Sequence, residues 1–513
     1  MRPSLITALV ALLIFAALSP QSFAGGVVGT GTPDSCTEAA LDDTARGGGL
    51  VTFNCGGPAT ITVTASRQIN NDMTIDGGGV ITISGGNSVG FVTLGKATLT
   101  LQNLTFVDLN GILDGTPVGA LYNNSGTLSI INCTFSGNSA PIISNTAVTV
   151  TTVTTVTNST FSDNSGGVIG NGGTLTVSNS TFSGNSGGVI SNNNGTGGTF
   201  TITDSTFSGN SGGAISSYYG GTTGTITDST FSGNSGGAIG NAGTLTVINS
   251  TFSGNTFTGY PHGAGAIGNS GTLTVINSTF SGNAGSGSFA NSIQNSGTLT
   301  FTNTIVANTT NGANCFAQSG TIIDGGDNLD DGTSCGFNTL NGSLNNTNPL
   351  LDSAGLANNG GPTQTIALEA DSPAIDAGDE SVCAAPPVDN LDQRGYVRPG
   401  VGATNCSIGA YEYNAQPSSE PTATATETPV STSSPTGTPT AAAVPTPTVA
   451  PCVGDCNGDG TVTVNEILTM VNIALGNAPV TACEAGDANH DGRITVDEIL
   501  MAVNNALNGC RVS

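Results

Sequence analysis

The chain repeats one short phrase, exemplified by "STFSGNSGGAIGNAGTLTV" at residues 229–247, and this repeat limits the possible folds more than any other feature. Each unit contains short runs of Thr, Val, Ile and Phe between turns rich in Gly, Ser and Asn, and no run has the period of a helix. A unit of about 25 residues cannot bury its own apolar side chains, so it must stack on copies of itself. We therefore expect three short strands per unit and a parallel β-helix. The units align on Phe106, Phe135, Phe161, Phe182, Phe207, Phe231, Phe252, Phe280 and Val306.

Two columns of side chains should follow from this stacking. Rungs of such a solenoid repeat at about 4.8 Å, so the aligned phenylalanines should form an aromatic stack inside the coils. An amide or carboxylate stands three residues before each aligned position, and we expect this second column to form a side-chain amide ladder. Like charges stacked at that distance repel, which explains why residues 97–393 contain no Lys or Arg. The second column comprises Asn103, Asn132, Asn158, Asn179, Asp204, Asp228, Asn249, Asn277 and Asn303.

The first 24 residues, "MRPSLITALVALLIFAALSPQSFA", have the pattern of a secretory signal peptide. Their apolar stretch is short for a membrane span, and Ser22-Phe23-Ala24 fits a cleavage site. A net charge of −26 disfavours nucleic acid as a partner and favours cations. We expect a secreted protein, extracellular or at the cell surface, with no membrane span and no nucleic-acid partner.

Eleven cysteines suit an oxidising compartment. Their neighbourhoods favour short-range disulfides between residues 36 and 55, 315 and 335, and 383 and 406, and they leave Cys133 over. Four more cysteines, at 452, 456, 483 and 510, allow three connectivities. With two His in the chain, no Cys-His spacing supports a zinc site.

Composition divides the mature chain into five regions. Residues 25–69 include the one early stretch with helical composition, and we expect them to cap the N-terminal end of the solenoid. The repeats occupy 70–312, and the more acidic residues 313–413 should hold the last coils and a C-terminal cap. Residues 414–450 are rich in Pro, Thr, Ser and Ala, which is typical of an extended linker, and 451–513 switch to helical periodicity.

Two loops after the linker carry the sharpest chemical signal. "DCNGDGTVTVNE" (455–466) and "DANHDGRITVDE" (487–498) both fit the D-x-[DN]-x-[DN]-G-x5-E pattern of an EF-hand calcium loop. Ca²⁺ takes six to eight oxygen ligands, which such a loop supplies. We predict two Ca²⁺ sites, each followed by an apolar helix. The predicted ligands are Asp455, Asn457, Asp459, Thr461 (carbonyl) and Glu466 in the first loop, and Asp487, Asn489, Asp491, Arg493 (carbonyl) and Glu498 in the second.

This tail resembles a type I dockerin, in which two calcium loops, each followed by a helix, come after a Pro/Thr linker. The resemblance implies a small all-α domain that docks onto a cohesin module, often on enzymes that degrade plant polysaccharide. The sequence differs from the usual pattern at position 12, which is Glu, and at positions 10 and 11, which are Val464-Asn465 and Val496-Asp497. We expect a cohesin-like or cell-envelope partner for residues 451–513.

Three further phrases, "SPAIDAGD" (372–379), "DQRGY" (392–396) and "CSIGAYEY" (406–413), resemble the end region of bacterial surface-exposed β-helix proteins of the choice-of-anchor type. "SCTEAALDDTARGGGLVTFNCGG" looks like their N-terminal region. The resemblance implies an all-β right-handed parallel β-helix solenoid, export and an interchangeable anchor, and it implies no reaction.

The sequence indicates no catalytic residues. A polysaccharide lyase needs a basic residue to take a proton, and residues 97–393 contain neither Lys nor Arg. A hydrolase needs paired acids near His and a cationic clamp, and His262 has no such clamp. Asp204 and Asp228 occupy the same column in adjacent coils, so they are weak candidates for a cation or substrate site. The alternative is that Asp simply replaces Asn in the column.

Three functions remain open. The chain can be an exported, non-catalytic surface or adhesion shaft whose neutral face contacts polysaccharide and whose calcium tail anchors it. It can instead be a carbohydrate-active enzyme, a polysaccharide lyase or glycoside hydrolase with a pectate-lyase-like fold, acting in polysaccharide degradation. In the third case the shaft binds nothing, and only the tail recognises a partner. Cations near an acidic groove would favour the enzyme, and the sequence shows none.

Overall fold

The computed structural model describes residues 25–418 except 114–115, 118, 147–151, 193–197, 219, 258–262, 286–291 and 311. Nearer the C-terminus it describes residues 452–456, 462–474, 480–488, 493–495, 498–499, 501–502 and 505. The chain divides into two compact units, Met1–Thr426 and Glu427–Ser513. The predicted signal peptide and nearly all of the linker lie outside the described residues, so both stay predictions.

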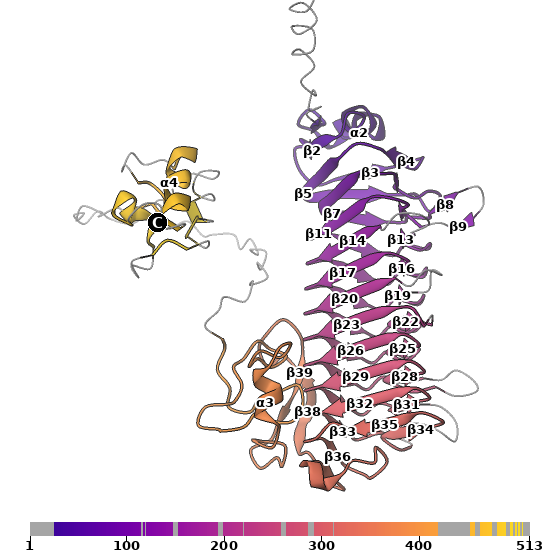
Figure 1. The fold of residues 1–513 in the computed structure, drawn as a ribbon. Coiled ribbons are helices and arrows are strands. Elements are labelled where there is room, and N and C mark those ends of the chain that lie inside the picture. The colour runs from indigo at the N-terminus through magenta and orange to yellow at the C-terminus, as the bar shows by residue number, and fades with distance from the viewer. Residues whose placement is uncertain are drawn as a thin grey trace, which may run out of the picture. The chain divides into compact units, whose positions relative to one another are not determined.

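The larger unit is an all-β, right-handed parallel β-helix whose third face is a sheet of 11 strands (Figure 1). Each turn contributes three short strands, as the repeat predicts. The first strand carries the "TLTV" run, in β11 (Thr127–Ile131), β14 (Val153–Thr157), β17 (Thr174–Ser178), β20 (Thr199–Thr203), β23 (Thr223–Thr227), β26 (Thr244–Ile248), β29 (Thr272–Ile276), β32 (Thr298–Thr302) and β35 (Thr321–Asp324).

The second strand carries the aligned position, which is Phe as far as Phe280 and Val, Asp and Asn in the last three strands. It is β12 (Thr134–Ser136), β15 (Thr160–Ser162), β18 (Thr181–Ser183), β21 (Thr206–Ser208), β24 (Thr230–Ser232), β27 (Thr251–Ser253), β30 (Thr279–Ser281), β33 (Ile305–Ala307), β36 (Leu329–Asp330) and β37 (Leu344–Asn345). The third strand is β4 (Arg67–Ile69), β6 (Val92–Leu94), β10 (Leu121–Asn123), β13 (Ile143–Asn145), β16 (Ile169–Asn171), β19 (Ile190–Ser191), β22 (Ile215–Ser217), β25 (Ile239–Asn241), β28 (Ile267–Asn269), β31 (Ile293–Asn295) and β34 (Cys315–Ala317).

The coils begin earlier than the boundary predicted at residue 70. Strand β1 (Gly26–Val28) pairs in parallel with β2 (Gly49–Phe53), and β2 and β3 (Ala59–Thr62) pair with β5 (Met73–Ser84). Next comes β7 (Thr98–Val107), which pairs in parallel with β5 on one side and with β11 and β12 on the other. The helix α2 (Glu38–Ala45) covers the N-terminal end of the stack (Figure 1), so only part of residues 25–69 acts as a cap.

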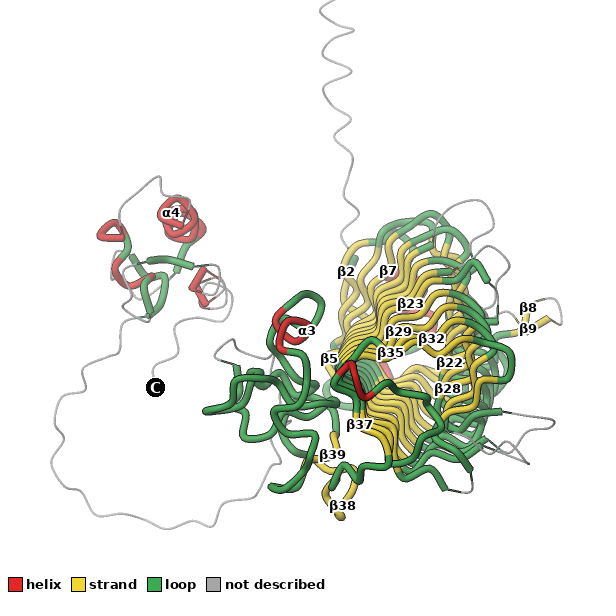
Figure 2. The backbone as a smooth tube through the Cα atoms, turned by 60° about the horizontal axis from the view of Figure 1, so that its bottom comes forward, coloured by secondary structure: helices red, strands yellow, loops and turns green. Residues whose placement is uncertain are grey.

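The aromatic stack is confirmed. The eight rings from Phe106 to Phe280 follow one another with centroids 4.6–4.9 Å apart and planes within 8°. All eight are fully buried inside the coil, whose strands stack in register when seen closer to the axis (Figure 2). Each buried Phe contributes about 1.5–3 kcal/mol from burial, so this column is a main source of the solenoid's stability.

The column of Asn and Asp has a different role from the one predicted. All nine residues adopt the left-handed conformation, with φ between 44° and 54°, in the tight bend between the first and second strands. Asn and Asp tolerate this conformation better than other residues that carry a Cβ. A hydrogen bond does join Asn132 to Asn103 at 2.7 Å, but the turn explains why the column accepts Asp as well as Asn.

Amide ladders run instead through two other columns. The Asn that follows each aligned Phe by three positions donates from Nδ2 to Oδ1 of the equivalent Asn in the next coil, at 2.8–2.9 Å and in an unbroken series. This series comprises Asn138, Asn164, Asn185, Asn210, Asn234, Asn255 and Asn283, all fully buried. A second ladder at the end of the third strand links Asn123, Asn145, Asn171 and Asn192, and then Asn241, Asn269 and Asn295.

Residues 349–418, the flanking segment, lie along the side of the last coils and not over their end (Figure 1). The segment contains the hairpin of β38 (Leu351–Ala357) and β39 (Thr365–Leu368) and the short helix α3 (Glu380–Ala384). Its polar groups bind the second strands: Thr230 Oγ1 donates to the Gln364 carbonyl at 2.5 Å, and Thr251 Oγ1 to Gln393 Oε1 at 2.6 Å. The last coils of the predicted region 313–413 thus end near residue 345.

Two buried ion pairs organise the flanking segment. Arg398 and Glu412 are both fully buried and 3.0 Å apart. Arg394 binds Asp392 at 2.7 Å, and its guanidinium lies 3.7 Å from the centroid of the Tyr411 ring. The phrases "DQRGY" and "CSIGAYEY" therefore build the interior of this segment.

The predicted disulfides Cys36–Cys55, Cys315–Cys335 and Cys383–Cys406 are present. Cys133 is buried and unpaired, and burial raises the pKa of its thiol to about 11, so it stays protonated. No helix in the described parts of the chain is long and apolar enough to cross a membrane.

The smaller unit contains α4 (Val464–Ala474) and two 3-10 turns, η4 (Val480–Ala482) and η5 (Glu484–Gly486). Helical backbone also occurs at residues 498–499 and 501–502. Most of the second predicted helix lies outside the described residues, so the all-α dockerin-like architecture stays a prediction.

Candidate functional site

Four of the predicted calcium ligands are buried carboxylates in the smaller unit. Asp455 and Glu466, from the first loop, and Asp487 and Glu498, from the second, are 2–9% exposed. Arg493 is exposed. The other predicted ligands, Asn457, Asp459, Thr461, Asn489 and Asp491, lie outside the described residues.

The two glutamates are held in the same way. Glu466 accepts from the backbone N–H of Cys456 at 3.0 Å and from that of Thr463 at 2.8 Å. Glu498 accepts from the N–H of Ala488 at 2.9 Å and from that of Thr495 at 2.8 Å. Each glutamate therefore closes its own loop by binding residues two and nine of that loop.

This donor set suits a hard divalent cation. Burying a carboxylate is costly unless it is paired or binds a metal, and Ca²⁺ prefers carboxylate and carbonyl oxygens. The disulfide Cys456–Cys483 ties the first loop to the segment before the second, and Cys452 is disulfide-bonded as well. The four carboxylates are thus of the type that calcium binds, but no three His, Cys, Asp or Glu side chains in the described residues lie close enough together to hold an ion, so both sites stay predictions.

Asp204 and Asp228 are brought together, and the flanking segment contacts Asp228. They stand in adjacent coils directly after the register partners Thr203 and Thr227. The flanking segment binds the backbone of Asp228, whose carbonyl accepts from Thr363 Oγ1 at 2.9 Å. Burial raises the pKa of Asp204, and burial followed by the charge of Asp204 raises that of Asp228. One carboxylate oxygen of Asp228, Oδ1, is buried, while the residue as a whole stays partly exposed.

A groove on the third face was not anticipated from the sequence. In β22, β25, β28 and β31 the first and last residues point inward and the middle residue points outward, as the burial pattern buried–intermediate–buried shows. The outward residues of four consecutive coils are register partners: Ser216, Gly240, Gly268 and Gln294. The two glycines leave the middle of this row without side chains.

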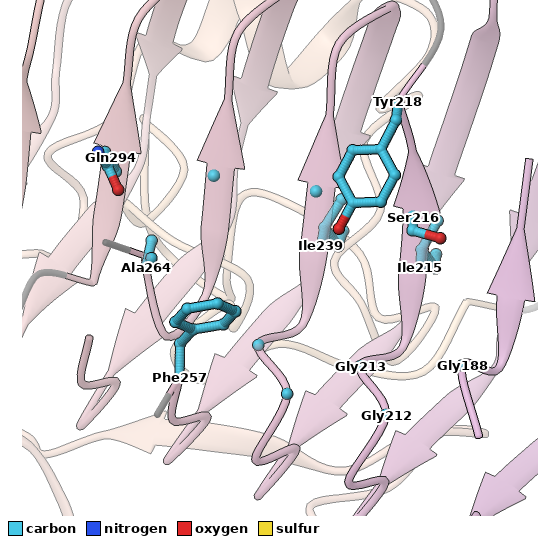
Figure 3. A pocket seen from close by; sticks show the side chains of 15 residues that line it. Gly188, Gly212, Gly213, Ile215, Ser216, Tyr218, Ile239, Phe257, Ala264 and Gln294 are labelled. Atoms are coloured by element: carbon cyan, nitrogen blue, oxygen red, sulfur yellow. The ribbon is translucent and has the colours of Figure 1, made fainter. Parts of the chain in front are cut away.

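Two aromatic side chains border this floor (Figure 3). Tyr218 follows β22, is 68% exposed and lies across Gly240, since a Cβ on that glycine would be 3.1 Å from the ring. Phe257 packs on Gly237 and Gly263. Together they bound a cavity of about 200 Å³, which adjoins one of about 160 Å³ beside Gly268 and Gln294. We call this site the glycine-floored groove.

No Asp, Glu, Lys, Arg or His is among the described residues that line the groove. Its surface offers aromatic rings, hydroxyls, a side-chain amide and exposed backbone, which suits an uncharged ligand with both polar and apolar faces. Sequence reasoning missed it because "AIGN" looks like turn chemistry. Aligning the middle residue of each third strand would have revealed a run without large side chains, from Ser144 to Gly268.

The family model described as "Right handed beta helix region" matches residues 89–252 and 196–348, which together span just over half of the chain. No curated protein matches the sequence significantly. Among solved structures, the catalytic unit of a thermostable GH87 α-1,3-glucanase from Streptomyces thermodiastaticus strain HF3-3 is 15% identical, with a TM-score of 0.40. The alignment covers 59% of this chain and 66% of that one.

Two other solved structures are similar at the same level. The catalytic domain of a GH87 α-1,3-glucanase in complex with tetrasaccharides is 13% identical, with a TM-score of 0.36 over 60% of this chain and 69% of that one. The pectate lyase Pel9A is 16% identical, with a TM-score of 0.37 over 73% of this chain and 90% of that one. These similarities concern the fold alone.

Proposed function

This chain belongs to the right-handed β-helix family, and from that premise we propose that it is an exported protein that binds a polysaccharide in the glycine-floored groove. The observation that carries the proposal is a groove lined by the Tyr218 and Phe257 rings, with open space above Gly268 and no charged residue in the described lining. Sugar rings have a flat apolar face that packs on aromatic rings and hydroxyls that bond to amides and backbone groups.

The direction of the floor suits a linear polymer. Ser216, Gly240, Gly268 and Gln294 come from four successive coils, so the row runs along the solenoid. The coils repeat at about 4.8 Å, which is close to the length of one hexose unit in an extended chain. Successive sugars would thus meet equivalent positions of the protein.

The smaller unit supplies the second part of the proposal, a calcium-dependent attachment module. Asp455, Glu466, Asp487 and Glu498, with the predicted ligands outside the described residues, would hold two Ca²⁺ ions. When bound, Ca²⁺ neutralises these buried carboxylates and fixes the loop ahead of each helix. A cohesin-like or cell-envelope partner would then recognise residues 451–513.

A polysaccharide lyase or glycoside hydrolase is the second candidate. The observation in its favour is the pair Asp204 and Asp228, whose raised pKa values are the kind of shift that general acid catalysis uses. The flanking segment contacts Asp228 and one of its carboxylate oxygens is buried, so we favour binding in the groove over catalysis at this pair.

A single added side chain tests the groove. Nothing lies within 4 Å of a Cβ placed on Gly268, so Gly268→Leu should fill the groove without disturbing the fold. Affinity electrophoresis of the mature chain through gels containing neutral or acidic polysaccharides would measure binding. We expect one polysaccharide to retard the mature chain and Gly268→Leu to lose most of that retardation.

Gly170→Leu is the matched control. Gly170 holds the same position of an earlier third strand, and a Cβ there meets only Ile143 O at 3.9 Å. Equal retardation of both variants and the unchanged chain would refute the groove as the binding site. Mass spectrometry of the soluble fraction tests the second candidate: oligosaccharides that form with the unchanged chain and not with Asp204→Asn would establish an enzyme.

A further inference from the structure

The Tyr218 side chain borders two cavities on the third face. The larger, of about 200 Å³, lies over the turns before the third strands and over their middle residues, and Phe257 borders it as well (Figure 3). The smaller, of about 160 Å³, lies at the ends of β25, β28 and β31, where Ser270 and Ser296 line it. We call this smaller cavity the side pocket. A polysaccharide backbone needs only the larger cavity, so the side pocket is left without a role.

The two cavities meet above Gly268. Both Gly268 and Gln294 line each of them. The Tyr218 ring lies over Gly240, the register partner of Gly268 in the preceding coil, whereas nothing lies within 4 Å of a Cβ placed on Gly268. The space above Gly268 therefore joins the larger cavity to the side pocket beyond the Tyr218 ring. A polymer in the larger cavity can extend a side group through this opening.

The two serines of the side pocket already use their hydrogens. Ser270 Oγ donates to the Asn241 carbonyl and Ser296 Oγ donates to Gln318 Oε1, both at 3.3 Å. Gln294 Nε2 donates to the same Gln318 oxygen at 3.0 Å, which fixes the Gln294 amide at the border between the cavities. The two hydroxyl oxygens are left as acceptors, so they suit a ligand that donates hydrogen bonds.

The side pocket also lacks charge. No Asp, Glu, Lys, Arg or His is among the described residues that line it. A uronate or sulfate group would enter it without a positive partner, which is unfavourable, and the net charge of −26 repels anions as well. A neutral sugar brings several hydroxyl donors for the serines and an apolar face for the Tyr218 ring.

We propose that the side pocket holds a single-sugar branch, so that the polysaccharide bound in the groove is neutral and branched. This inference rests on the proposed function, because the backbone must occupy the larger cavity. Ser270 and Ser296 follow the register partners Asn269 and Asn295, so they are about 4.8 Å apart and one sugar ring can reach both. One water takes about 30 Å³ in the liquid, so a cavity of about 160 Å³ is much larger than a hydroxyl or methyl substituent needs.

The test uses pairs of neutral polysaccharides that share a backbone and differ in their single-sugar branches. Suitable pairs are galactomannans of high and low galactose content, and β-1,3-glucans with and without single glucose branches. Affinity electrophoresis of the mature chain measures retardation by each member, and we expect the more branched member of one pair to retard it several-fold more. Ser270→Ala and Ser296→Ala each remove one acceptor. Each should weaken binding of that member by about fivefold and leave binding of its unbranched partner unchanged.

Ser319→Ala is the matched control, because Ser319 is an exposed serine of the next coil outside the described lining of the pocket. It should bind both members of a pair like the unchanged chain. Equal retardation by both members of every pair, lost in Gly268→Leu, would refute the branch and leave the groove as the binding site. Retardation by acidic polysaccharides alone would refute the neutral branch in the same way. Retardation that Gly268→Leu leaves intact, or no retardation by any polysaccharide, would refute the groove and the side pocket together.

Discussion

The ring of Phe200 fills the space that a side chain at Gly224 would occupy in the next coil. The two residues are register partners in β20 and β23, and a Cβ on Gly224 would lie 2.1 Å from Phe200 Cζ. Neighbouring coils carry Leu175 and Leu245 at the same inward position. Phe200 and Gly224 together thus fill the space that two leucines would fill at these positions.

We expect this pair to show strong coupling in a double-mutant cycle. Gly224→Leu forces atoms into an occupied space and should cost about 1–3 kcal/mol, while Phe200→Leu leaves a cavity. The double variant restores two stacked leucines, so its free energy of unfolding should lie close to that of the unchanged protein. Urea unfolding measures all four proteins, and additive losses would contradict the packing described here.

The two Asn columns should respond in opposite ways to glycine. Asn210→Gly removes a ladder residue that accepts from both the N–H and the Nδ2 of Asn185. It leaves buried donors unpaired, which costs about 1–3 kcal/mol each. Asn179→Gly removes an exposed side chain at φ 47°, a backbone conformation that glycine adopts without strain. Thermal unfolding should show a large loss for the first and almost none for the second.

Stability should depend on pH through Asp228. Its pKa in the folded protein is raised well above the ordinary value of 3.8, first by burial and then by the charge of Asp204, while a hydrogen bond from Asn249 opposes the rise. Such a group stabilises the fold at low pH, and this contribution is lost as pH rises from 3.8 through the raised pKa. The free energy of urea unfolding of Asp228→Asn should therefore rise relative to that of the unchanged protein across that window. A constant difference would contradict the shift.

Tyr218 should contribute directly to ligand affinity. Aromatic contacts add about 0.5–1.5 kcal/mol beyond burial, so Tyr218→Ala should weaken binding of the retained polysaccharide by up to about tenfold. Titration calorimetry with soluble fragments of that polysaccharide would measure the change. Tyr122→Ala, on the same face several coils away, is the control and should bind normally.

Calcium should order the smaller unit through its two glutamates. Glu466→Gln and Glu498→Gln each keep the hydrogen-bond acceptor and remove the charge, so each should abolish binding at one loop. Circular dichroism should show a calcium-dependent gain of helix in the unchanged chain and about half of it in each variant. No gain in the unchanged chain would contradict the two calcium sites.

The sequence predicted the coil and its aromatic stack because stacking requires the same residue at the same position of every unit, as from Phe106 to Phe280. It misplaced the ladder because two different demands select Asn. A left-handed bend needs Asn179 for its backbone, while the ladder needs Asn185 for its side chain, and the letters alone do not separate the two. The groove escaped notice because Gly240 and Gly268 look like turn residues until their strands are aligned.

The docking of the flanking segment could not be predicted. Its contacts join residues more than a hundred positions apart, such as Thr251 and Gln393, and they show no local pattern. The buried partners Arg398 and Glu412 were visible as charges, but nothing in the sequence indicated that they would face each other inside this segment.

The ladder through Asn138 to Asn283 also bears on how such a chain can change over generations. Every rung presents the same hydrogen-bonding groups above and below, so losing one whole unit, or duplicating one, would join surfaces that already match. In the described residues the flanking segment's hydrogen bonds to the coils begin at Asp228, and the groove lining begins at Gly188. The coils between residues 127 and 183 contribute neither to these hydrogen bonds nor to the groove lining. The number of coils can therefore change in that stretch through duplication or deletion in the gene, while the groove lining and the contacts of the flanking segment stay the same.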